Sequence, residues 1–305
     1  MRRPDFFVVG HPRSGSGQMN GYLERHPDLW MAKKELHYFG SDLGYHEPAR
    51  SLENFHGFFE DAPATAKRIG EASTWYLFSE NAAREIHEYN PKAGIIALLR
   101  NPVSLLHSLH SHFVFRGDED IADFGSALAA EEGRASGKVP EPEFHIPTEG
   151  LRYSRMVRYA PQIQRFFDVF GRENVHVVIN DDFRTDAREV FRGACRYLGV
   201  REDFPEFEDV FAPNQRARNS NRTVYSRKIQ DFLIHSERQQ VLEGVRSSPL
   251  PGWKFTLRAL RRVNIKYIDR DPMQPELKAE LQQRFLPHVE ELSELLDRDL
   301  THWCR

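Results

Sequence analysis

The sequence has few cysteines, no long apolar run and no recognisable targeting segment. Its 305 residues include only Cys195 and Cys304. These two thiols could pair, but so small a number favours a reducing, cytoplasmic location over a disulfide scaffold. No apolar stretch approaches the roughly 18–20 residues of a membrane span, and no apolar signal-peptide core follows Arg2 and Arg3. We therefore expect no stable membrane insertion.

An excess of basic charge is also missing. The 42 basic and 45 acidic residues give a formal charge of −3, whereas a dedicated nucleic-acid-binding protein is usually basic overall. We therefore expect no nucleic-acid partner, although a local basic pocket for a phosphorylated small molecule is compatible with this balance. The 40% hydrophobic and 29% charged residues are ordinary for a globular enzyme.

What the chain does contain is an alternation of apolar runs and helix-like segments. Strands are predicted at residues 6–9, 29–32, 69–73, 95–99 and 175–179. Helices are predicted at 17–25, 51–61, 81–89, 103–115, 123–132, 151–170, 184–198 and 275–300, the last interrupted by Pro287. This alternation predicts an α/β fold of three layers, a mostly parallel sheet with a P-loop-like nucleotide-binding core flanked by helices. We expect a single domain over 1–305, in which 116–150 forms a mobile lid or acceptor region.

The first predicted strand runs into a glycine-rich turn and then a helix. The turn reads Gly10-His11-Pro12-Arg13-Ser14-Gly15-Ser16-Gly17. A strand, a glycine-rich loop and a helix N-terminus together direct backbone N–H groups at an anion, usually a phosphate. Gly10 and Gly15 have P-loop spacing, but Ser16 and Gly17 stand where lysine and serine or threonine would follow. The loop thus predicts a phosphate site, with Arg13 as its cation, that lacks the usual Mg-ATP ligands.

A second arginine follows another predicted buried strand. Arg100 comes directly after residues 95–99, and Ser104 and Ser108 lie on the next predicted helix. An arginine can bind a phosphate through two N–H groups, to which a serine hydroxyl adds another bond. By themselves, these residues are equally compatible with a surface arginine beside two helix serines.

These motifs resemble the sulfotransferases that use 3′-phosphoadenosine 5′-phosphosulfate (PAPS), especially their carbohydrate (heparan-type) and bacterial branch. The family loop G-x-P-K-x-G-T-T is similar to residues 10–17. The family's HP and K-E-x-x-F/Y-F segments resemble His26-Pro27 and 34–39.

The remaining similarities follow in the family's order along nearly the whole chain. Residues 70–77 are similar to G-E-x-S/T-P-x-Y, and residues 281–303 to the closing helix. Residues 99–102 match L-R-N-P, with Ser108 eight residues after the arginine.

The resemblance implies a cofactor site in two halves. The 5′-phosphosulfate half would consist of His11, Pro12, Arg13, Ser14, Gly15, Ser16 and Gly17. Arg100 and Ser108 would bind the 3′-phosphate. Tyr153, Arg218 and Asn219 occupy places where relatives supply further cofactor contacts. No metal is expected, because one sulfuryl group carries less charge to neutralise than a phosphoryl group.

The resemblance also implies a general base, for which Glu35 is the first candidate. His37 is the rival because its ordinary pKa suits neutral pH better, and His11 in the loop is a weaker rival. Arg13 would stabilise charge on the leaving group, and Lys34 would assist at the sulfuryl group or the acceptor. Glu71 has two interpretations, orientation of a cation or acceptor and a structural ion pair.

Two departures from the family pattern accompany this prediction. Arg13 replaces the loop lysine, keeping the charge on a bulkier, planar group, and Gly17 replaces a threonine hydroxyl. The favoured function is transfer of a sulfuryl group from PAPS (leaving adenosine 3′,5′-bisphosphate, PAP) to a hydroxyl or amine of a small molecule, glycolipid or carbohydrate. The alternatives are a P-loop-type ATP-dependent kinase and a catalytically impaired PAP-binding homologue.

Overall fold

The computed structural model describes most of the chain. The described residues are 2–33, 35–44, 51–142, 147, 149–211, 222–242, 253–268 and 270–305. Three predicted site residues, Lys34, Arg218 and Asn219, lie outside these ranges.

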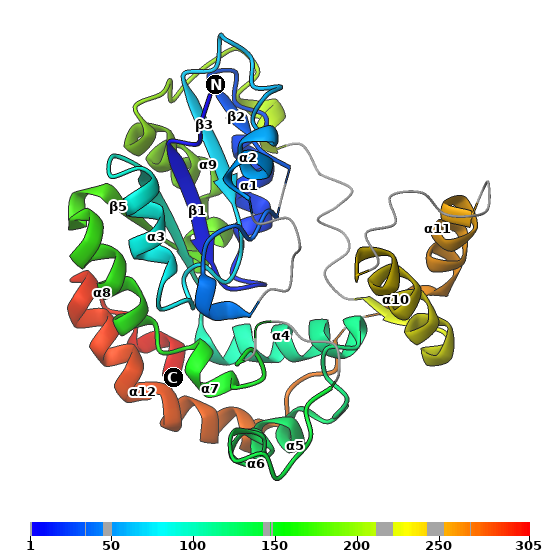
Figure 1. The fold of residues 1–305 in the computed structure, drawn as a ribbon. Coiled ribbons are helices and arrows are strands. Elements are labelled where there is room, and N and C mark those ends of the chain that lie inside the picture. The colour runs from blue at the N-terminus through cyan, green and yellow to red at the C-terminus, as the bar shows by residue number, and fades with distance from the viewer. Residues whose placement is uncertain are drawn as a thin grey trace.

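A five-stranded sheet forms the centre of the molecule (Figure 1), in the order β2-β3-β1-β4-β5. The strands are β1 (Phe6–Gly10), β2 (Leu29–Met31), β3 (Arg68–Ala72), β4 (Gly94–Leu99) and β5 (Val175–Ile179). All neighbouring strands pair in parallel, so their carboxyl ends share one edge. The predicted parallel sheet and its five strands are confirmed. The loop after β1 and Arg100 after β4 both leave the sheet at this edge.

Both faces of the sheet are covered, which explains why its strands are apolar at successive positions. Phe7 and Val9 of β1 belong to one core cluster, and Phe6 and Val8 belong to the other. The first face is covered by α3 (Ala82–Tyr89), α4 (Pro102–Arg116), α8 (Tyr159–Phe170) and α12 (Pro275–Leu296). The second face is covered by α1 (Ser16–Leu23) and α9 (Asn180–Leu198). Three layers result, as the sequence predicts.

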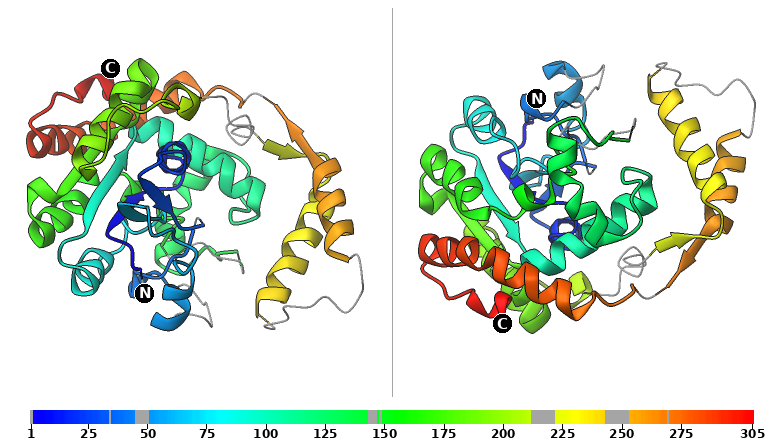
Figure 2. Two further views of the ribbon diagram at one scale, coloured as in Figure 1. Left: turned by 90° about the horizontal axis from the view of Figure 1, so that it is seen from above. Right: turned by 90° about the horizontal axis from the view of Figure 1, so that it is seen from below.

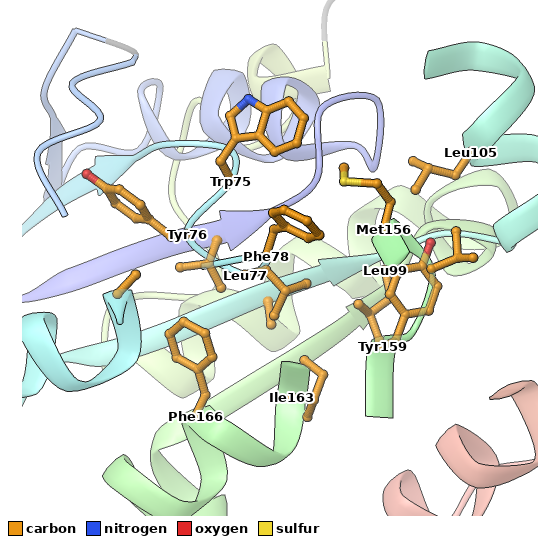
Figure 3. Packing of buried hydrophobic residues seen from close by; sticks show 14 of the residues in the cluster. Trp75, Tyr76, Leu77, Phe78, Leu99, Leu105, Met156, Tyr159, Ile163 and Phe166 are labelled. Atoms are coloured by element: carbon orange, nitrogen blue, oxygen red, sulfur yellow. The ribbon is translucent and has the colours of Figure 1, made fainter. Parts of the chain in front are cut away.

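The segment that follows β3 is anchored by large side chains in the first core cluster. Trp75, Tyr76 and Phe78 are all buried, and Figure 3 shows them in the core cluster that also contains Tyr159 of α8. Burial of each such ring contributes roughly 1.5–3 kcal/mol. A backbone hydrogen bond also holds residues 73–78 close to the end of β1: the Trp75 N–H donates to the Gly10 carbonyl at 3.0 Å.

Two predicted helices have different boundaries in the structure. The predicted helix 151–170 is divided into α7 (Tyr153–Met156) and α8, and 123–132 into α5 (Phe124–Ala129) and α6 (Glu131–Ala135). Within the predicted lid, α6 is tied down by a buried ion pair, in which the guanidinium of Arg134 donates to both carboxylate oxygens of Glu119. Mobility of the lid stays a prediction.

Pro287 does not interrupt the last long helix, so that prediction is wrong. The α12 helix runs unbroken from Pro275 to Leu296 with Pro287 inside it. A proline in a helix interior costs about 3 kcal/mol because it removes a backbone donor. Leu281, Phe285 and Val289 are buried around it, and their packing against the core outweighs that cost.

An antiparallel pair of short strands was not predicted. It joins β6 (Arg222–Val224) to β7 (Ile265–Tyr267), and α10 (Arg227–Leu242) and α11 (Trp253–Asn264) lie between them in the chain. Figure 2 shows these helices to one side of the sheet. The Gln230 side chain attaches them to α4 by donating to the Phe115 carbonyl at 3.0 Å. After β7 the chain returns to the core through Arg270.

The remaining short helices lie around the sheet. They are η1 (Ser41–Leu43), α2 (Leu52–Gly57), η2 (Arg172–Asn174), η3 (Glu208–Phe211) and η5 (Thr301–Cys304). None of the helices in the described ranges combines the length and apolarity needed to cross a membrane. Cys195 and Cys304 are both free thiols.

Candidate active site

The loop between β1 and α1 has a backbone that depends on Gly15. Gly15 caps α1 with a φ of 113°, in a region that residues with a side chain rarely adopt. A Cβ on Gly15 would lie 2.6 Å from Nδ2 of Asn180 at the start of α9. Arg13 also has a positive φ, of 74°, a conformation that is uncommon outside glycine and that clusters at functional sites. The loop is thus compact and backbone-lined, as an anion site requires.

Gly15 and Gly17 form a matched pair of substitutions. We expect Gly15→Ala to destabilise the fold by about 1–3 kcal/mol and to weaken anion binding, because the left-handed backbone and Asn180 both oppose a methyl group. A Cβ on Gly17 would meet no atom within 4 Å, so Gly17→Ala should instead stabilise α1 by up to about 1 kcal/mol. Urea unfolding of both variants measures the difference. Equal effects would show that the loop conformation is not the one described.

Three arginines from distant parts of the sequence converge beside this loop. Arg13 donates from Nε to the Ser108 hydroxyl of α4 at 3.0 Å, and Arg270 donates from Nη2 to the same oxygen at 3.2 Å. Arg100 donates from Nη1 to the backbone carbonyl of Arg13 at 3.0 Å. Arg13, Arg100, Arg270 and Ser108 are called the arginine cluster below. The predicted loop cation and the predicted 3′-phosphate residues are therefore brought together.

Burial makes the positive charge of this cluster costly. Desolvation lowers the pKa of the Arg100 guanidinium below its ordinary value, and desolvation and the neighbouring Arg100 do the same for the pKa of Arg270. Ser108, which accepts from two of the guanidiniums, is 1% exposed. A bound anion would offset the cost of gathering these cations.

Arg270 is a site residue that the sequence does not reveal. It lies between β7 and α12, about 160 positions after Ser108, and between two aspartates, where it looks like part of an ordinary charged turn. Only the antiparallel pairing of β6 with β7, itself missed, would have suggested that the chain returns to α4 at this point.

A second group of polar residues surrounds Glu35. Thr74 donates its hydroxyl to Oε2 of Glu35 at 2.8 Å, and Nε2 of His37 lies 2.9 Å from the same oxygen. The Glu35 and His37 side chains are 25% and 21% exposed, so solvent or a substrate can reach them. The two rival bases are therefore direct neighbours. His37 has a positive φ of 48°, which marks a tight turn in this segment.

The two groups are joined through the segment after β3. Thr74 contacts Glu35, and the next residue, Trp75, donates its backbone N–H to the carbonyl of Gly10, at the start of the loop between β1 and α1. The candidate base and this loop thus share one short scaffold at the carboxyl edge of the sheet. Ligands of open α/β sheets bind at this edge.

The other loop residues take different positions. His11 is buried in the core, where its Nε2 lies 2.7 Å from Oε1 of Gln162, and burial lowers its pKa to about 4. A neutral imidazole directed at α8 leaves only the backbone of His11 for an anion. Ser14 is 1% exposed and its hydroxyl has no hydrogen-bond partner among the described residues. Ser16 is also buried, whereas Pro12 is half-buried and Gly17 is exposed.

Tyr153 is not brought to the arginine cluster. Its ring is buried, and its hydroxyl donates to Oε2 of Glu119 at 2.8 Å. Burial, with the nearby Glu119 carboxylate, raises the pKa of this phenol above its ordinary value. The structure thus shows Tyr153 holding the buried Glu119–Arg134 ion pair, a contact that the sequence did not suggest.

No cluster of three or more histidine, cysteine or acidic side chains suited to a metal ion occurs in the part of the chain that the structure describes. The fold and the site define an α/β protein with a P-loop-like loop, half-buried arginines and a carboxylate–histidine pair at one edge of its sheet.

Comparisons with known proteins agree with this description. No family model matches the chain. The crystal structure of a sulfotransferase from Alicyclobacillus acidocaldarius has a TM-score of 0.70 and 27% sequence identity, covering 100% of both chains. The chain is 35% identical over 103 residues to the membrane-associated sulfotransferase kil1 of Dictyostelium discoideum, which is 33% of this chain and 21% of that protein.

A longer match is found with the bifunctional heparan sulfate N-deacetylase/N-sulfotransferase 1 of Caenorhabditis briggsae. It has 22% identity over 208 residues, which is 67% of this chain and 23% of that protein. The chain thus spans only about a fifth to a quarter of the length of these curated relatives. These similarities support the sulfotransferase family that the sequence predicts, including its bacterial branch.

Proposed function

We propose that this protein transfers a sulfuryl group from PAPS to a hydroxyl or amine of an acceptor. The observation that supports this most strongly is the arginine cluster beside the glycine-dependent loop, because PAPS carries anionic groups at both its 5′ and 3′ positions. The similarity of the chain to sulfotransferases favours the same reaction. When bound, PAPS would supply the sulfuryl group and a stable leaving group.

The residues present fit such a donor. The loop offers backbone N–H groups at the start of α1, and the buried Ser14 hydroxyl lacks a described partner. In the arginine cluster, one hydroxyl oxygen accepts from both Arg13 and Arg270. A phosphate has more acceptor lone pairs than a hydroxyl and could satisfy several guanidinium groups at once.

The binding roles follow from position in the cluster. Arg100, Ser108 and Arg270 would hold the 3′-phosphate, which makes the site selective for PAPS over adenosine 5′-phosphosulfate. Arg13, which belongs to both the loop and the cluster, would balance the negative charge that develops on the leaving group. A planar guanidinium suits these two contacts, one to the leaving group and one within the cluster, better than a lysine ammonium does, since its N–H donors point in several fixed directions.

Glu35 would act as the general base. Its carboxylate would take the proton from the acceptor hydroxyl or amine, a role for which it must be accessible and fixed in position. Thr74 and His37 meet both needs by holding Oε2 while leaving the side chain partly exposed. The assistance predicted for Lys34 and the contacts predicted for Arg218 and Asn219 concern residues outside the described ranges.

The acceptor would be a small molecule, a glycolipid or a carbohydrate. One relative is named for N-sulfotransfer in heparan sulfate, which supports a carbohydrate hydroxyl or amine as an acceptor to try first. A cytoplasmic location is part of the same proposal, and the free thiols of Cys195 and Cys304 are compatible with it.

Titration calorimetry with PAP and with Mg-ATP tests the donor assignment. We expect PAP to bind at least 100-fold more tightly, a difference of about 2.7 kcal/mol, because only PAP brings a 3′-phosphate to the arginine cluster. Adenosine 5′-phosphosulfate, which lacks that phosphate, is the matched control ligand and should bind weakly. Tight binding of Mg-ATP without a response to PAP would overturn the proposal in favour of a kinase.

A further inference from the structure

A buried carboxyl group lies close enough to the candidate base Glu35 for the two charges to interact. Glu71 is the fourth residue of β3, opposite Phe7 of β1, and it is 0% exposed. No cation of the described chain forms an ion pair with it. One of its oxygens, Oε1, accepts a hydrogen bond from the hydroxyl of Ser73. Burying a carboxyl group costs free energy unless hydrogen bonds or a paired charge compensate for the lost water.

The hydrogen bonds of Ser73 determine which way its proton points. Its oxygen accepts the backbone N–H of Leu36 at 3.0 Å and that of His37 at 2.9 Å. A serine hydroxyl has two acceptor lone pairs and one proton. Both lone pairs are thus occupied, and the single proton is left for Oε1 of Glu71. Glu71 therefore holds Ser73 in the one orientation that accepts from the turn beside Glu35.

The second oxygen of Glu71 indicates that the group can carry a proton. Oε2 is buried and has no hydrogen-bond partner among the described residues. An ionised carboxylate would leave negative charge on this unsatisfied oxygen, whereas a neutral carboxyl places its proton there. Burial accordingly raises the pKa of Glu71 to about 7, even though Ser73 and His37 act in the opposite direction.

We propose that Glu71 is a positioning residue for the base: through Ser73 it fixes the turn that carries Glu35 and His37, and by losing its proton it increases the proton affinity of Glu35. This inference rests on the proposed function of Glu35. A charge on Glu71 repels the charge on Glu35 through a water-poor interior, where such repulsion is stronger than in solvent. A Glu35 that neighbours an ionised Glu71 is therefore the stronger base.

The surroundings of Glu71 limit which groups can respond to its charge. The titratable groups that face it are Glu35 and His37 of the segment after β2 and Tyr76 of the segment after β3. Desolvation raises the pKa of Tyr76 well above its ordinary value, so this phenol stays neutral. Strand β1 contributes Phe7, which does not titrate. Glu35 and His37 are therefore the groups that ionisation of Glu71 affects.

The proton on Glu71 can be measured without turnover, by infrared titration of the resting protein. We expect a protonated carboxyl band that disappears at about pH 7 in the wild type and is missing in Glu71→Gln. Glutamine keeps the shape and can still accept from Ser73. The free energy of unfolding provides a second readout. Glu71 binds its proton more tightly in the folded than in the unfolded protein, so the folded state loses stability as pH rises from about 4.5 to 7. Glu71→Gln should remove that loss.

Turnover then tests the effect on the base. The assay follows radiolabelled sulfate from PAPS to naphthol and to glucosamine across pH. We expect the transfer rate of the wild type to increase with pH near pH 7, an increase called the upper rise below. This upper rise should vanish in Glu71→Gln, while the affinity for PAP stays within twofold. Ser73→Ala should lower the rate about tenfold at every pH and keep the upper rise, because the turn is loosened but the charge is retained.

Glu85→Gln is the matched control. Glu85 holds the far end of the same segment by accepting the backbone N–H groups of Gly40 and Ser41, so its loss perturbs the segment but leaves Glu71 in place. It should keep both the carboxyl band and the upper rise. A wild type without a carboxyl that titrates near pH 7, or an unchanged profile in Glu71→Gln, would overturn the inference. Absence of PAP binding to the wild type would instead refute the proposed function, and the infrared result would still stand.

Discussion

Replacing Arg100 with alanine is expected to weaken PAP binding by about 100-fold, or about 2.7 kcal/mol. A hydrogen bond to a charged group is worth about 1.5–3 kcal/mol, and a guanidinium can make two of them to one phosphate. Arg100 also donates to the carbonyl of Arg13, so its loss releases part of the loop between β1 and α1. Calorimetry with PAP measures the change directly.

The matched ligand for this experiment is adenosine 5′-phosphosulfate. Because it lacks the 3′-phosphate, its affinity should change far less than that of PAP in Arg100→Ala, and the same contrast is expected in Arg270→Ala. Arg188→Ala is the protein control, since Arg188 is an exposed arginine paired with Glu208. An Arg100→Ala protein that binds PAP as the wild type does would show that the 3′-phosphate lies elsewhere.

Replacing Glu35 with glutamine is expected to reduce the transfer rate by 100-fold or more while leaving PAP affinity unchanged. General base catalysis contributes roughly 10²–10⁴-fold to a rate, and glutamine keeps the size of the side chain but cannot take a proton. The radiolabel assay with naphthol and glucosamine gives the rate, and calorimetry gives the affinity. Loss of both together would indicate a folding defect instead of a missing base.

His37→Asn separates the two rival bases. If Glu35 is the base, removal of the imidazole should lower the rate less than Glu35→Gln does, because Thr74 still holds the Glu35 carboxylate. A Glu35→Gln protein that keeps its activity, together with an inactive His37→Asn protein, would assign the base to His37. The direct contact between the two side chains makes this comparison necessary.

Most residues of the candidate site could be predicted because they belong to short, contiguous motifs. The loop from Gly10 to Gly17 and the Arg100–Ser108 pair follow buried strands, and strand ends are visible as apolar runs. Their contact in space also follows from the parallel sheet, since β1 and β4 are neighbours. Arg270 could not be found in this way, because its approach to Ser108 depends on how a distant pair of short strands returns the chain to α4.

The sequence by itself determined the fold class, the five strands of the sheet and the glycine-rich loop after β1, since apolar runs and glycine spacing are local properties. The tertiary structure decided where single side chains point. It directed His11 and Tyr153 into the core, kept Pro287 within an unbroken helix, and placed Glu71 close to Glu35. Each of these outcomes depends on burial and on hydrogen-bond partners from other elements. Their contributions to the free energy come from residues distant in the sequence, so no single stretch of sequence reveals them.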